Sequence, residues 1–327
     1  MNVSQGIKNI QIHATTRYPI VSAYEFEFLK TESQVKELLK PCTIYFIMQR
    51  PVLYINNFVA KHGKISFEIN DDTDSAPLIC SFYPSDNGFC RSDEELLIDA
   101  QFYKKQPDLS QPFNEMAAFK IHAIDQEFLG WFSPQKFIYE FLCGGLKAKV
   151  DGCIEDYLDY TVHYIGKAFS QDIWERLTGH HKMQKILTLE DSLNTKALKA
   201  PFEISLLMLD IDGFDESNIF PLFDFAIPDG VDPVIHTFDF NDDNESFENY
   251  YLPKLESKSE ELTTETEAFL VSLFKPSYND TLFKNYPNIK NGTRDAGYTS
   301  STVLIENLPA ILITDTHTQN VILPKYA

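Results

Sequence analysis

The stretch YTVHYIGKA, Tyr160–Ala168, decides the fold of the C-terminal half of this 327-residue chain. Its aromatic and β-branched residues predict a strand from Tyr160 to Gly166, where the glycine turns the chain. The following residues predict a helix from about Ile173 to Leu187, because Asp172 and Glu175 have the spacing of a capping box. The sequence therefore predicts a strand that leads through a short turn into a helix.

Further elements follow in the same half of the chain. Pro201 precedes a predicted strand, Phe202 to Leu209, and Thr264 to Phe274 is predicted to be a helix that Pro276 ends. Residues 210–262 between them are acidic and dotted with aromatic residues. We interpret this segment as a large insertion with a solvated loop.

The first half is predicted to be rich in strands and to contain no cluster of chemically active residues. A helix is predicted to begin at Ser133-Pro134 and to end before Gly144-Gly145. The expected domains are residues 1–145, a β-rich domain of unknown role; residues 150–295, an α/β module; and residues 296–327, a terminal hairpin. Other predicted elements of the first half are a helix at Thr31–Leu39 and strands at Ile44–Met48, Lys64–Ile69 and Ala76–Phe82.

The formal charge of 28 − 48 = −20 argues against a nucleic-acid partner when it is taken as an average. The charge is uneven, however, because Lys167–Lys199 is locally basic while Asp210–Glu267 holds much of the acid. The five cysteines form no Cys-x-x-Cys pair, which is typical of reduced thiols. No signal peptide and no apolar run of membrane-spanning length is evident, so we expect a cytoplasmic protein without a membrane partner.

One set of residues has the side-chain types and the spacing expected of a catalytic site. Tyr164 ends the predicted strand, Lys167 follows the turn, and Arg176 and His180 share one face of the next helix because they are four residues apart. Much later, Glu267 lies on an apolar helical stripe, where a carboxylate is costly unless it is paired or bound to a metal.

With Asn279, these residues resemble the GIY-YIG endonuclease family, and most of all the catalytic domains of the bacterial excision-repair incision nuclease and of homing endonucleases. In that repair enzyme a Tyr-[Ile/Val]-Gly-Lys-Ala turn leads to an arginine, and a later helix runs from a glutamate to Pro-x-Tyr-Asn. The spacings from Arg176 to His180 and from Glu267 to Asn279 fit, and the spacing from Tyr164 to Arg176 is slightly longer. The resemblance covers roughly residues 150–290.

The resemblance implies an α/β fold with a small, mainly antiparallel central sheet flanked by helices. It also implies a metal-dependent endonuclease that hydrolyses phosphodiester bonds of DNA, with RNA as an alternative that the sequence does not separate. Glu267 would hold Mg²⁺ or Mn²⁺, and Arg176 would clamp the phosphate. Lys167 would supply a positive field for Tyr164, His180 would shuttle a proton or bind the phosphate, and Asn279 would orient the site.

One family feature is missing at its usual place. The first motif, a Gly-Ile-Tyr strand shortly before the second, is matched only by Gly152-Cys153-Ile154, which lacks the tyrosine. Either Tyr157 or Tyr160 could stand in for it spatially. In several family members this tyrosine is implicated as a general base, so catalytic competence depends on its replacement.

Two alternative interpretations need no catalysis. Glu267 can be a capping-box residue, since Thr264 precedes it by three positions. The whole module can instead be an inactive interaction domain whose acidic insertion, 210–262, binds a protein partner. A partner could also bind the N-terminal domain.

Overall fold

The chain folds around two β-sheets. The computed structural model describes residues 9–73, 75–169, 173–177, 181–193, 201–215 and 259–320. His180 and residues 216–258 of the acidic segment therefore lie outside the described residues. The sheets dominate an α/β architecture, which confirms the expected class at this level.

The first sheet has eight strands and is mixed. Its order is β13-β1-β12-β3-β11-β14-β15, and β2 pairs with β12. The centre, β12-β3-β11, is antiparallel, whereas β13 and β14 run parallel to β1 and β11. The bounds are β1 Asn9–Thr16, β2 Val21–Ser22, β3 Cys42–Pro51, β11 Asp159–Lys167, β12 Phe202–Asp215, β13 Ser300–Glu306, β14 Ile311–Ile313 and β15 Thr318–Asn320.

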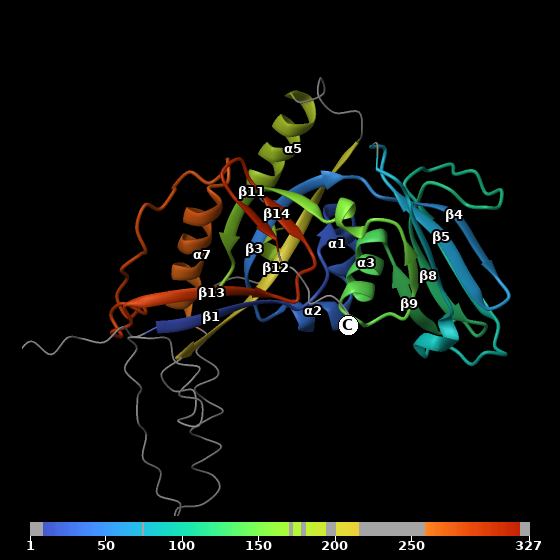
Figure 1. Cartoon of the computed structure of the whole chain (residues 1–327), viewed down its shortest axis with the longest axis horizontal. Coiled ribbons are helices and arrows are strands. Elements are labelled where there is room, and N and C mark those ends of the chain that lie inside the picture. The colour runs from blue at the N-terminus through green and yellow to red at the C-terminus, as the bar shows by residue number, and fades with distance from the viewer. Residues whose placement is uncertain are drawn as a thin grey trace, which may run out of the picture.

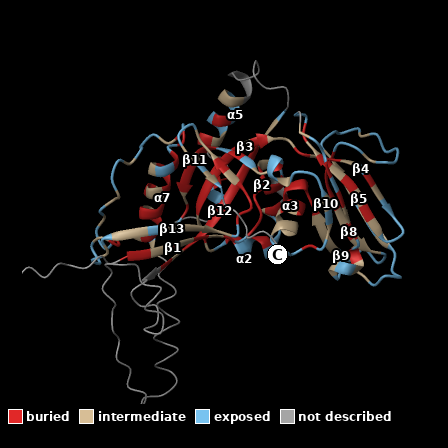
Figure 2. Ribbon diagram, in the orientation of Figure 1, coloured by how far each residue is buried: buried red, intermediate tan, exposed pale blue. Residues whose placement is uncertain are grey.

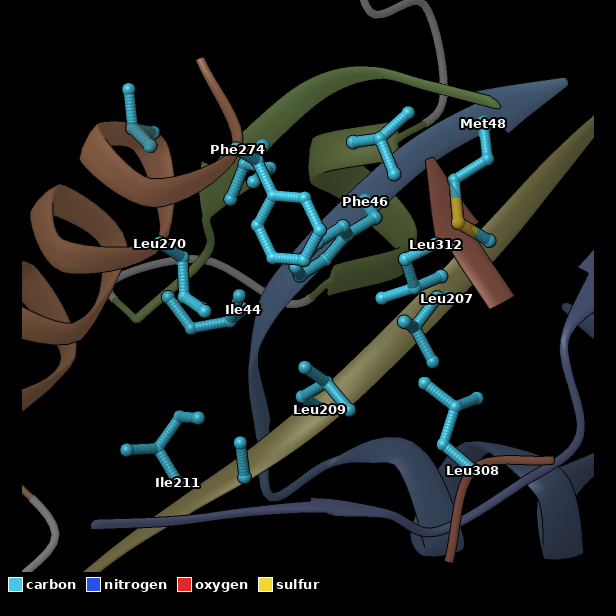
Figure 3. Packing of buried hydrophobic residues seen from close by; sticks show 14 of the residues in the cluster. Ile44, Phe46, Met48, Leu207, Leu209, Ile211, Leu270, Phe274, Leu308 and Leu312 are labelled. Carbon is cyan, nitrogen blue, oxygen red and sulfur yellow. The ribbon is translucent and has the colours of Figure 1, made fainter. Parts of the chain in front are cut away.

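Helices cover both faces of this sheet, because β3 is apolar on both sides. Phe46 faces α7 (Glu260–Phe274), where its ring meets Phe274 edge-on at 5.7 Å between centroids (Figure 3). Tyr45 faces the opposite side. That side is covered by α1 (Ala23–Leu29), α2 (Ser33–Leu39), α4 (Ile173–Leu177) and α5 (His181–Leu193).

The second sheet belongs to an inserted lobe, residues 52–158, which lies beside the first sheet at the end away from α7 (Figure 1). The lobe has an aromatic-rich core of its own, visible as buried strand positions in Figure 2. Its elements are β4 Tyr54–Lys61, β5 Lys64–Asn70, β6 Leu78–Phe82, η1 Pro84–Asn87, β7 Leu96–Phe102, β8 Met116–Ala123, β9 Phe128–Phe132, α3 Pro134–Leu142, β10 Lys149–Asp151 and η2 Ile154–Tyr157.

The expected division of the chain near residue 145 is wrong, because the sheets do not follow it. Strands β1 and β3 precede that boundary, yet they pair with β12, β13 and β11 of the first sheet. The lobe is a single excursion between β3 and β11. The β-rich half was correctly expected, but its first 51 residues belong with the C-terminal module.

The expected C-terminal hairpin, 296–327, is also wrong in part. Strand β13 pairs with β1 and takes no part in a hairpin within this segment. The hairpin of the segment is the short pair β14–β15. The predicted helix at 173–187 is described as two helices, α4 and α5. The N-cap at Ser133 is confirmed, since its hydroxyl accepts from the backbone N–H of Lys136 at 3.3 Å.

In the part of the chain that the structure describes, no helix combines the length and the apolar composition needed to span a bilayer.

Candidate active site

Two tyrosines from neighbouring strands meet on the face covered by α4 and α5. Tyr45 on β3 lies opposite Gly166 on β11, and Tyr164 is two residues before that glycine on the same face. The two phenol rings are 6.1 Å apart between centroids and tilted by 37°. A Cβ at Gly166 would lie 2.6 Å from Tyr45 Oη and 2.7 Å from Tyr164 Cε1, so no side chain fits between them.

Arg176 joins this pair from α4. Attraction to the oxygen of Tyr45, followed by a hydrogen bond with it, raises the pKa of the guanidinium despite partial burial. Tyr164 and Glu267 act on Arg176 in the same direction. The arginine therefore faces both tyrosines and the carboxylate, as a phosphate clamp would need to.

Glu267 lies on α7, about two turns from the start of the helix. The N-cap is Ser259, whose hydroxyl accepts from Leu262 N at 2.9 Å, and Thr264 is already inside the helix. The capping-box interpretation of Glu267 is therefore wrong. Its carboxylate serves no helix end.

The cations around Glu267 neutralise its charge only in part. Lys167 Nζ lies 4.0 Å from Glu267 Oε2 and donates to Thr264 Oγ1 at 2.5 Å. Burial nevertheless raises the pKa of Glu267, because its effect exceeds the opposing effects of Lys167 and Arg176. The side chain remains 19% exposed, so a further cation could reach it.

Asn279 fixes the edge of β11 beside the tyrosines. Its Oδ1 accepts from Ile165 N at 3.0 Å and its Nδ2 donates to Ile165 O at 2.8 Å. This pairing continues the sheet edge with a side-chain amide, between Tyr164 and Gly166. The next residue, Asp280, accepts two hydrogen bonds of 2.8 Å from Lys182 Nζ, which ties α5 to the same loop.

The positive field at Tyr164 has a different source from the one expected. Burial raises the pKa of Tyr164, and Glu267 adds to the rise. A hydrogen bond with Tyr45 and the charges of Arg176 and Lys182 oppose it. Lys167, expected in this role, lies instead beside Glu267.

The structure thus brings together five residues predicted from the sequence, namely Tyr164, Lys167, Arg176, Glu267 and Asn279, while His180 lies outside the described residues. It excludes both tyrosines considered as replacements. Tyr157 donates to Ala76 O at 2.8 Å inside the lobe, and Tyr160 accepts from Arg50 at 2.7 Å.

The tyrosine that joins the site is Tyr45, which sequence reasoning missed. The available signal was the run Thr43-Ile44-Tyr45 at the start of the predicted strand Ile44–Met48. Burial raises the pKa of Tyr45, and Arg176 opposes that rise both by its charge and by a hydrogen bond.

A divalent cation would fit this site in one way. Within the described ranges, no group of three or more His, Cys, Asp or Glu side chains could enclose a metal ion. Glu267 is a single hard-oxygen donor, so water molecules would have to complete the coordination shell. That shell matches the one the resemblance implies.

No known protein family, no curated protein and no solved structure matches this chain in sequence or fold comparisons.

Proposed function

We propose that this protein is a metal-dependent nuclease of the GIY-YIG type that hydrolyses phosphodiester bonds, with DNA as its substrate. The observation that carries the proposal is that Arg176 interacts with Tyr45, Tyr164 and Glu267. These residues come from β3, β11, α4 and α7. Three of them were selected by order and spacing alone.

Tyr45 supplies what the resemblance lacked. Thr43-Ile44-Tyr45 is similar to the family's Gly-Ile-Tyr motif, with threonine in place of glycine. It lies on β3, the antiparallel neighbour of the strand that carries Tyr164. We therefore assign Tyr45 as the first-motif tyrosine, separated from the second motif by the inserted lobe.

In the proposed mechanism, Arg176 binds the non-bridging oxygens of the scissile phosphate and stabilises the negative charge that grows on them. A divalent cation held by Glu267 would neutralise charge on the phosphoryl group. Tyr45 accepts the proton of the attacking water. A phenol does this near neutral pH only in a strong positive field. Arg176 opposes the rise that burial gives the pKa of Tyr45 but does not cancel it, so the charge of the bound cation would have to lower that pKa further.

Tyr164 and Asn279 position this machinery. Tyr164 hydrogen-bonds Tyr45 and holds its hydroxyl in place. Asn279 holds the backbone of Ile165 and so keeps Tyr164 in register. Lys167 neutralises part of the charge of Glu267 when no cation is bound.

The test is cleavage of plasmid and of structured RNA in Mg²⁺ or Mn²⁺, for the parent protein and for Glu267→Gln. Gln keeps the size of the side chain and removes its charge, so activity should be lost while the fold is kept. Glu260→Gln, at an exposed position of the same helix, is the matched control and should cleave like the parent. Equal cleavage by both variants would remove Glu267 from the mechanism. A parent protein that cuts neither nucleic acid would favour the inactive interaction module.

A further inference from the structure

The inserted lobe carries a basic hollow beside strands β5, β6 and β10. In the register of β5, β6 and β10, Ser66, Ser81 and Lys149 form one cross-strand row. One step beyond this row, Lys64, Tyr83 and Lys147 follow on the same side. The hollow that these three residues border measures about 680 Å³, and Phe141 and Leu146 also line it.

The backbone around this hollow is held in place. Asn87 Nδ2 donates to the carbonyl oxygens of Tyr83 and Lys147, at 3.0 Å each. Asn87 Oδ1 accepts from Lys147 N at 2.7 Å. The turn that carries Asn87 ends at Gly88, whose φ of 76° suits glycine. Lys147 and Tyr83 are thus fixed next to each other although 64 positions separate them in the sequence.

The three ammonium groups of the hollow have no acidic partner among the residues that the structure describes. Other lysines of this acidic protein are paired, for example Lys104 with Glu115 and Lys182 with Asp280. Asp86 is the one acid that lines the hollow, and it forms no ion pair with these lysines within the described ranges. In a chain of net charge −20, three unpaired cations in one hollow favour an anionic ligand.

The arrangement of the lysines around an exposed aromatic ring favours a phosphate backbone as the anionic ligand. Tyr83 is 46% exposed, and Lys64 Nζ lies 5.9 Å from the centre of its ring. An exposed aromatic ring amid separated cations suits a nucleotide, which offers both a phosphate and a flat base. The basic area is narrow, because the next cross-strand row, on the other side of Lys149 from Lys147, contains Glu68 and Asp151.

We propose that Lys64, Lys147 and Lys149 bind the phosphate backbone of the nucleic-acid substrate, with Tyr83 stacking on an unpaired base. The lobe thereby acts as a second, non-catalytic contact that holds the substrate outside the tyrosine site. This proposal rests on the proposed nuclease function and adds to it the surface that gives the substrate affinity.

Binding tests this surface separately from cleavage. Fluorescence anisotropy of labelled DNA, single-stranded and duplex, is measured in EDTA over a series of salt concentrations. The variant K64Q/K147Q/K149Q is compared with K105Q/K284Q/K290Q, whose lysines are exposed and form no ion pair with any described residue. Both variants lose three positive charges, so a general charge effect would be equal in the two.

Each phosphate contact contributes about 0.7 to 0.9 to the slope of log K against log salt. We expect the hollow variant to lower that slope by about two to three units, and the control variant to leave it unchanged. Tyr83→Ala should weaken the binding of single-stranded DNA, whereas Tyr83→Phe should preserve it.

The outcomes separate the two proposals. If the parent binds DNA and both lysine variants lose affinity equally, the hollow is not the contact, while the nuclease proposal stands. If the parent binds no DNA at low salt, the nuclease proposal fails with it. If polyglutamate competes as well as DNA of equal charge, the hollow fits an acidic protein and the phosphate assignment is overturned.

Discussion

Gly166→Ala tests the tyrosine pair without touching a reactive group. The glycine lies on β11 opposite Tyr45, and its backbone is ordinary strand, so the effect of the substitution is purely steric. The new methyl group would meet three atoms at 2.6 to 2.7 Å, namely Tyr45 Oη, Tyr45 Cζ and Tyr164 Cε1. Contacts this short require one ring to move.

The cost follows from the burial of both rings. Tyr45 is fully buried and Tyr164 is half-buried, so neither ring can simply swing into solvent. Overpacking of a core position costs about 1 to 3 kcal/mol. We expect the free energy of unfolding to fall by that amount. Cleavage should fall further, because the displaced hydroxyls no longer face Arg176.

The assay is urea unfolding together with single-turnover cleavage of plasmid DNA. A double-mutant cycle with Tyr45→Leu supplies the control, since leucine removes Oη and Cζ. Gly166→Ala should then cost less stability in the Tyr45→Leu background than in the parent. If Gly166→Ala leaves both stability and cleavage at parental values, the close approach of the two tyrosines is not real.

Three further predictions concern Arg176, Asn279 and Glu203. Arg176→Lys keeps the charge but loses the planar fork, so kcat should fall by at least tenfold while the fold is kept; parental kcat would exclude a bidentate clamp. Asn279→Ala leaves the N–H and C=O of Ile165 without their partner and should lower the free energy of unfolding by about 1 to 3 kcal/mol in urea; no change would mean that water replaces the amide. Burial, together with the charge of Glu25, raises the pKa of Glu203 to about 8 despite Arg50 nearby. Between the ordinary pKa of glutamate and about 8, the folded state holds a proton on Glu203 that the unfolded state has released. Stability should therefore fall as the pH rises through this range, and Glu203→Gln should reduce the slope, of which buried Glu25 keeps a part.

The local parts of the fold could be predicted from the sequence. The strand at Tyr160–Gly166 and the helix at Thr264–Phe274 are found as β11 and α7, within a few residues at each end. The helix is longer than predicted, because Ser259 and not Thr264 caps it. Periodicity and capping residues are features of a few consecutive positions. They therefore predict single helices and strands but not which elements pack or pair with them.

The partners of each strand could not be predicted in the same way. Strand β1 lies between β12 and β13, which are about 200 and 290 residues further along the chain. Nothing in the alternation of β1 specifies which distant strands will cover its edges. The boundary expected near residue 145 is wrong for this reason, because the break in the helix pattern at Gly144-Gly145 is a local signal.

The role of Tyr45 could not be predicted from the sequence, because a motif is defined by spacing along the chain, whereas strand pairing brings residues together from distant parts of the chain. Strands β3 and β11 are antiparallel neighbours, so Pro51 at the end of one and Asp159 at the start of the other lie at the same end of the sheet. A segment inserted there enters and leaves at adjacent points. Its length therefore has no effect on the register that sets Tyr45 opposite Gly166.

Arg50 and Tyr160 contact each other where the lobe joins the first sheet. They link β3 and β11 through a hydrogen bond of 2.7 Å and a cation–π contact of 4.8 Å. Both side chains are buried where the lobe begins and ends. We expect the lobe to bind a ligand without displacing Tyr45 and Tyr164, because this contact fastens β3 to β11 at the point where the lobe begins and ends. Arg50→Met should break this contact. It also removes the cation beside buried Glu203 and Glu25, so urea unfolding must first show that the variant is folded. In the Arg50→Met background, substitution of Lys64, Lys147 and Lys149 should lower kcat as well as change KM. In the parent background, the same substitutions should change KM alone.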